Sequence, residues 1–91
     1  MVTFDEAKRQ ANIAKHGIDL AEVGSAFDSR LVTTEDDRVA YGEQRLISLA
    51  WWNGRVVVLL WTERDSGAHV FSCRNADKSQ IHEYIRAISG Q

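Results

Sequence analysis

The chain has 91 residues, a length typical of one small domain, and we expect residues 1–91 to form a single unit. Hydrophobic residues make up 44% and charged residues 26%, as in ordinary globular proteins, and the net charge of −2 argues against strong nonspecific binding to nucleic acid. No stretch approaches the roughly 18 apolar residues of a membrane span, and the first residues lack the apolar run of a signal peptide. We therefore expect a cytoplasmic protein without a membrane contact.

Helix signals open the chain. Thr3 and Glu6 have the spacing of a capping box, and Gly17 is placed to end this helix in a left-handed C-cap. A second capping pair predicts another helix over residues 19–28. Three alanines form the expected apolar edge of the first helix: Ala7, Ala11 and Ala14.

Strand signals follow. Asn53–Gly54 is a strong hairpin signal, because both central residues of a type I′ turn have positive φ. A second turn is expected at residues 65–67. The strands predicted around these turns cover Leu31–Thr34, Arg45–Trp52, Arg55–Thr62 and Ala68–Arg74.

The last element is a helix again. Asp77 and Gln80 have capping-box spacing, and apolar residues recur behind them at helical intervals. The predicted fold class is therefore α+β, with two N-terminal helices, an antiparallel four-stranded meander sheet and a C-terminal helix.

The hairpin also predicts which residues share a face of the sheet. Pairing Leu49 with Val58 places only apolar residues on one face, and we expect this face to lie under the helices. The opposite face is mixed in polarity, and we expect a site there. A regular second hairpin adds Ser72 and Arg74 to the mixed face and turns Cys73, the only cysteine, toward the core. The other members of the mixed face are Ser48, Ala50, Trp61, Glu63 and Val70.

Two cations, an amide and an imidazole fall along one edge of the first helix. Lys8, Asn12, Lys15 and His16 are spaced at i, i+4, i+7 and i+8, which places them on one side of a helix. Such a stripe suits the binding of an RNA backbone, with His16 as a general acid or base. The alternative is a solvated helix edge with cations near its C-terminus.

Two charged residues lie where the third strand runs into its turn. Glu63 and Arg64 follow Thr62, and the predicted register places Glu43 opposite Arg64. One possibility is an exposed cross-strand ion pair between Arg64 and Glu43. The other is that Glu63 and Arg64 supply an acid and a guanidinium aimed at a scissile phosphate.

The last strand carries a further candidate. Arg74, with Ser72 two residues before it, suits phosphate clamping on the mixed face. Trp52 and Trp61 are either stacking platforms for bases or ordinary packing residues. The three histidines fall on different elements and there is no glycine-rich phosphate loop, so we expect neither a metal ion nor a cofactor.

Several short motifs follow one another along nearly the whole chain. They are Phe4-Asp5-Glu6-Ala7-Lys8, Lys15-His16-Gly17-Ile18, Ala26-Phe27-Asp28, Gly42-Glu43-Gln44-Arg45, Asn53-Gly54-Arg55-Val56, Thr62-Glu63-Arg64 and Ser72-Cys73-Arg74-Asn75-Ala76. In this order they resemble the BrnT family of small toxins from bacterial toxin–antitoxin pairs. The resemblance implies a RelE-like fold and a ribonuclease that arrests translation. It also implies a cognate ribbon-helix-helix antitoxin, similar to BrnA, so that DNA is contacted only through the toxin–antitoxin complex.

The resemblance also implies roles for individual residues, in a metal-independent cleavage by the RNA's own 2′-hydroxyl. One set is catalytic: His16, Glu63, Arg64 and Arg74. The resemblance also assigns RNA binding to Lys8, Lys15 and Tyr84. The stripe on the first helix and the mixed face of the last strand add Asn12 and Ser72 to the RNA-binding set.

The chain departs from the family pattern in the last strand and in the final helix. His69 and Asn75 replace two basic residues, and Gln80 replaces a glutamate. In the final helix, Ser79-Gln80-Ile81-His82 replaces an arginine-rich run. The alternative function is therefore a catalytically weakened binding module that keeps only antitoxin binding and operon autoregulation. Convergence of the cations at positions 8, 15, 64 and 74 on one cleft favours the enzyme, and their dispersal favours the module.

Overall fold

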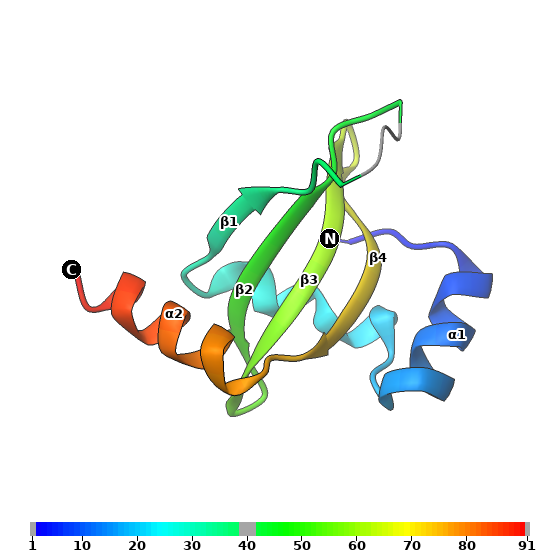
Figure 1. Ribbon diagram of the computed structural model, residues 1–91. Coiled ribbons are helices and arrows are strands. Elements are labelled where there is room, and N and C mark those ends of the chain that lie inside the picture. The colour runs from blue at the N-terminus through cyan, green and yellow to red at the C-terminus, as the bar shows by residue number, and fades with distance from the viewer. Residues whose placement is uncertain (1, 39–41, 91) are drawn as a thin grey trace.

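The computed structural model describes residues 2–38 and 42–90 (Figure 1). Its elements are α1 (Glu6–His16), the 3₁₀ helix η1 (Leu20–Asp28), β1 (Val32–Glu35), β2 (Leu46–Trp52), β3 (Arg55–Arg64), β4 (Gly67–Asn75) and α2 (Lys78–Ile88). The strands form one antiparallel sheet in the order β1-β2-β3-β4. This confirms the α+β class and the four-stranded meander. None of the helices in the described ranges is long and apolar enough to cross a membrane.

The N-terminus of α1 differs from the prediction. Asp5, and not Thr3, is the N-cap, and its side chain accepts a hydrogen bond from the backbone two residues on at 2.8 Å. Thr3 instead pairs with β4, where its backbone donates to the carbonyl of Ala68 and its hydroxyl is 2.7 Å from Nδ1 of His69. The capping prediction for Thr3 was wrong because a long-range bridge to the sheet edge uses this residue. Gly17, at φ 69°, ends the helix as predicted.

The predicted apolar edge of α1 is also wrong. All three of its alanines are exposed, and Asn12 is the buried residue of the helix. A methyl group offers little apolar area to bury, so alanines alone hold a helix on a sheet weakly. η1, in contrast, packs through apolar side chains that are fully covered: Leu20, Val23 and Ala26.

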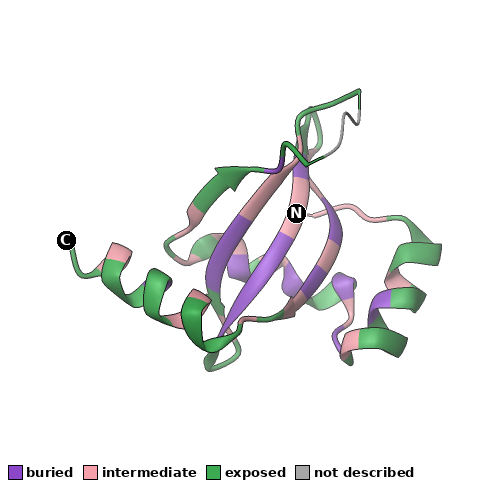
Figure 2. Cartoon of the chain, in the orientation of Figure 1, coloured by how far each residue is buried: buried purple, intermediate pink, exposed green. Residues whose placement is uncertain are grey.

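The two faces of the sheet are covered unequally (Figures 1 and 2). η1 lies over one face and buries Ala50, Val57 and Leu59 completely. α2 covers only part of the other face, where Tyr84 packs on Leu49 and its neighbours. Part of this second face is left open, and we call it the open face.

The first hairpin has the predicted register. Asn53 and Gly54 have φ of 53° and 79°, and Leu49 lies opposite Val58. However, the mixed face predicted to carry the site lies under η1. Ser48 is fully buried there, and its hydroxyl has hydrogen-bond partners within the core. The indole Nε1 of Trp61 donates to its Oγ at 2.8 Å, and the Thr33 hydroxyl lies 2.7 Å from the same oxygen. Ser48 contributed to the prediction of a partly polar, solvent-exposed face, but its hydrogen bonds are made within the core.

The second hairpin contains a β-bulge that the sequence did not predict. Leu60 lies opposite Ser72 and Trp61 opposite Val70, so Phe71 is an extra residue in β4. A shift of one residue moves the side chains that follow to the other face. Ser72 and Arg74 therefore lie on the open face, and not with Trp61 as predicted.

Cys73 is buried as predicted, but under η1. Burial raises the pKa of its thiol to about 12, so the thiol stays protonated at neutral pH. Trp61 and Trp52 pack against the same core, and the ring of Trp61 makes an edge-on contact with Phe27 at 5.1 Å.

Replacing Ser48 with alanine should lower the free energy of unfolding by about 1–3 kcal/mol, because the Trp61 indole N–H loses its buried acceptor. Urea unfolding of Ser48→Ala measures the loss, and the exposed Ser25→Ala serves as the control. Equal stability of the two variants would show that the hydrogen bond contributes nothing.

Candidate active site

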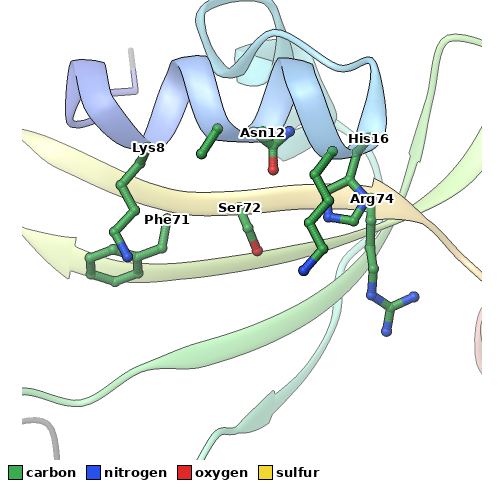
Figure 3. A pocket seen from close by; sticks show the side chains of 8 residues that line it. Lys8, Asn12, His16, Phe71, Ser72 and Arg74 are labelled. Carbon is green, nitrogen blue, oxygen red and sulfur yellow. The ribbon is translucent and has the colours of Figure 1, made fainter.

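A groove of about 340 Å³ runs between α1 and β4. Figure 3 shows Lys8 reaching over the ring of Phe71 at one end and His16 beside Arg74 at the other. We call this the α1–β4 groove. It is lined by Lys8, Ala11, Asn12, Lys15, His16, Phe71, Ser72 and Arg74. All of these residues come from only two elements.

Asn12 fixes α1 against β4. The residue is 4% exposed, and its amide nitrogen donates to the carbonyls of Ile18 and Cys73 at 2.8 and 2.9 Å. Its amide oxygen accepts from the backbone nitrogen of Cys73 at 3.1 Å. Because both donors and the acceptor are used by backbone groups, Asn12 has a structural role in this groove. The rest of the stripe predicted on this helix then lies along the groove.

The bulge in β4 forms the opposite wall. Phe71, the extra residue, is 8% exposed, and the guanidinium of Arg45 lies 3.8 Å from the centre of its ring. The ammonium of Lys8 lies 5.9 Å from the same centre. Cation–π contacts of this kind hold both cations near the groove. Sequence reasoning missed Arg45 and Phe71 here, although both lie within or beside motifs of the family resemblance.

Arg74 stands at the other end of the groove. Its Nη1 donates to the carbonyl of Asn75 at 3.1 Å and to Oε1 of Gln80 at 3.2 Å. Gln80 also closes the capping box of α2 with Asp77, as predicted. The start of α2 therefore orients the guanidinium. An amide in this position leaves the charge of Arg74 intact, whereas a carboxylate would neutralise it.

The groove is locally positive in an acidic protein. Lys8, Lys15 and Arg74 line it together with His16, and among the residues that the structure describes no carboxylate is part of its lining. A basic cleft attracts polyanions even when the net charge of the chain is negative. In the same described ranges, no cluster of three or more His, Cys, Asp or Glu is arranged to hold a metal ion.

Three predicted site residues lie outside the groove. Arg64 forms the predicted ion pair with Glu43, at 3.1 Å. Strand alternation places Arg64 on the open face and the exposed Glu63 on the other. Arg64 lies opposite Gly67, which is roughly 20 Å from Arg74 along β4 at the usual rise per residue. Tyr84 is buried, and its hydroxyl donates to the carbonyl of Arg30 at 2.9 Å.

His69 ties the N-terminal segment to β4. Its Nδ1 is hydrogen-bonded to the Thr3 hydroxyl, and its ring makes an edge-on contact with the ring of Phe71, with 5.3 Å between the two ring centres. Burial lowers its pKa below the usual 6.5, with a smaller contribution from the nearby charge of Arg64. The neutral ring is therefore the form that fits this site.

A family model described as "Ribonuclease toxin, BrnT, of type II toxin-antitoxin system" matches residues 4–80. The match extends from the residue before Asp5 to the first turn of α2 and includes the whole lining of the groove. A search of curated proteins finds no match to the chain.

Removing the Asn12 amide should detach α1. We expect Asn12→Leu to lower the free energy of unfolding by about 1–3 kcal/mol, because buried backbone groups lose their partners. Amide hydrogen exchange should speed up across α1. The control is Gln10→Leu on the exposed side of the same helix, which should leave both quantities nearly unchanged. Unaltered exchange in Asn12→Leu would contradict this role.

The low pKa of His69 predicts a pH effect on stability. A histidine whose folded-state pKa is depressed stabilises the fold above its unfolded pKa of about 6.5, and this contribution is lost as the pH falls through the folded value. The melting temperature of the native protein should therefore fall between pH 7 and pH 5 more than that of His69→Gln. An equal fall in melting temperature for the two proteins over this pH range would contradict the prediction.

Proposed function

The chain belongs to the BrnT family of ribonuclease toxins of type II toxin–antitoxin systems, and we propose that it cleaves RNA without a metal ion in the α1–β4 groove. One observation carries the proposal. Lys8, Lys15, His16 and Arg74 line a single groove, and no carboxylate lines it among the described residues. Cleavage of RNA by its own 2′-hydroxyl requires a base and a cation at the reacting phosphate, and His16 beside Arg74 offers both at one end of this groove (Figure 3).

In the proposed reaction, the 2′-oxygen of RNA attacks the adjacent phosphorus and the bond to the 5′-oxygen breaks. The products are a 2′,3′-cyclic phosphate and a 5′-hydroxyl. One proton passes overall from the 2′-oxygen to the 5′-oxygen, and the imidazole of His16 carries it. The guanidinium of Arg74 stabilises the charge on the non-bridging oxygens of the transition state. Lys8 and Lys15 bind the flanking phosphates.

The remaining candidates have other roles in this proposal. Arg64 lies on the open face beyond the groove, where it can bind a more distant phosphate, and Glu63 on the other face takes no part in the proton transfer. Asn12 and Tyr84 act through the fold, because their polar atoms are bound to the backbone. The convergence of three cations favours the enzyme over the weakened binding module, even though Arg64 lies apart.

A toxin of a type II system has an antitoxin partner. We propose that this antitoxin is a ribbon-helix-helix protein similar to BrnA, that the complex contacts DNA through the antitoxin, and that it represses its own operon. We further propose a RelE-like relationship for the fold. The free toxin acts in the cytoplasm, where cleavage of RNA arrests translation.

Loss of Arg74 should abolish toxicity without unfolding the protein. Induced expression of the native chain should stop growth and fragment RNA, and co-expression of the neighbouring reading frame should relieve both. Purified Arg74→Ala should cleave RNA about 10²–10³-fold more slowly, with and without a chelator. Arg86→Ala, which removes an exposed arginine of α2, is the control. Undiminished growth arrest by a folded Arg74→Ala would remove this residue from the site.

A further inference from the structure

A second groove, of about 270 Å³, lies on the open face of the sheet next to the first. We call it the open-face groove. Ile47, Val58 and Leu60 give it an apolar floor, whereas Ser72 and Arg74 line both grooves. The two grooves therefore meet at Arg74. On one side of this guanidinium lie the lysines of α1, and on the other lies an apolar surface.

We propose that the open-face groove binds one base of the RNA, from the nucleotide whose phosphate contacts Arg74. This inference rests on the proposed function and names a subsite of the same interface. A nucleotide joins a flat ring with apolar faces to an anion. The structure offers the matching pair, an apolar floor and a guanidinium at its edge. The volume falls just below the ~300–1,000 Å³ of pockets for drug-sized ligands, which suits a single ring system.

The wall of the open-face groove provides groups that can read the edge of a base. Oε1 of Gln80 accepts hydrogen bonds from the Asp77 backbone and from Arg74. Its Nε2 makes no hydrogen bond within the described residues and is available as a donor. The Ser72 hydroxyl is likewise unbonded there and can donate or accept. A glutamate at position 80 would instead pair with Arg74 and repel the phosphate.

The charges around the open-face groove favour one orientation of the nucleotide. At the rim, the guanidinium of Arg38 forms two bonds with the carboxylate of Asp36, at 2.6 and 2.9 Å, and this carboxylate is fully buried. The pair has little net charge. The uncompensated positive charge therefore lies at the Arg74 end, where the phosphate belongs.

The test uses RNA hexamers with 2′-O-methyl riboses, which lack the attacking hydroxyl and stay intact. In a matched series, a single abasic site is moved through the hexamer so that the phosphates are unchanged. Fluorescence anisotropy gives the affinity of each oligonucleotide. For the native protein we expect one abasic position to weaken binding about ten-fold, and the others to change it little. In Leu60→Thr this position-specific loss should disappear.

Ile85→Thr is the matched control, because it removes an exposed apolar side chain of α2 and should keep the native pattern. If Leu60→Thr fails to fold, Ile47→Thr tests the same floor. A native protein that tolerates every abasic site equally, but needs Arg74 for binding, would overturn the base subsite and leave the proposed function standing. Failure of the native protein to bind any hexamer would overturn both.

Two further results would also contradict the base subsite. A position-specific loss that persists in folded Leu60→Thr would place the base elsewhere. If Leu60→Thr weakened binding of the antitoxin while the abasic pattern stayed native, the floor would belong to the protein partner and not to a base.

Discussion

The attachment of α1 to β4 by the Asn12 amide is the interaction on which the site depends. The helix buries little apolar area, since its alanines and its one large apolar residue, Ile13, are all exposed, so hydrophobic packing contributes little to holding it in place. Three hydrogen bonds from one buried side chain fix its position and its rotation about its axis. Lys8 adds a contact with the ring of Phe71, and the cationic edge of the helix lies beside the sheet as the wall of a groove.

The second constraint is the bulge at Phe71. Without the extra residue, Arg74 would point toward the core under η1, where a guanidinium could not be accommodated without a partner. The bulge turns it to the open face and places the ring of Phe71 under two cations. Gln80 then orients the guanidinium from the start of α2. A toxin of the BrnT family thus assembles its candidate site from one irregularity in a strand and one buried amide.

Features encoded by neighbouring residues could be predicted from the sequence. The Asn53–Gly54 hairpin, the capping box that starts α2 and the ion pair between Glu43 and Arg64 depend on turn chemistry and register. Predictions that depended on long-range contacts failed. Nothing near Thr3 indicates that it pairs with β4, and nothing near Ser48 indicates that Trp61 satisfies it in the core.

The same distinction explains what could be predicted of the site. The helical spacing of Lys8, Lys15 and His16 was sufficient to place them on one edge of α1. The face on which Ser72 and Arg74 lie depends on the bulge in β4, which has no local signal in the sequence. The sequence therefore could not show that Arg74 lines the groove whereas Arg64 lies outside it. The structural role of Asn12 could not be predicted either, because an amide beside two lysines is equally consistent with binding RNA and with bonding to the backbone.

The most direct test of the central claim is to locate bound RNA on the protein. Amide NMR spectra of the labelled native chain, recorded with an intact 2′-O-methyl hexamer, should show their largest changes in α1 and in residues 71–75 of β4. The turn after Arg64 should change little. Changes centred on that turn, or on the exposed edge of β1, with the α1–β4 groove unaffected, would contradict the claim that RNA binds in this groove.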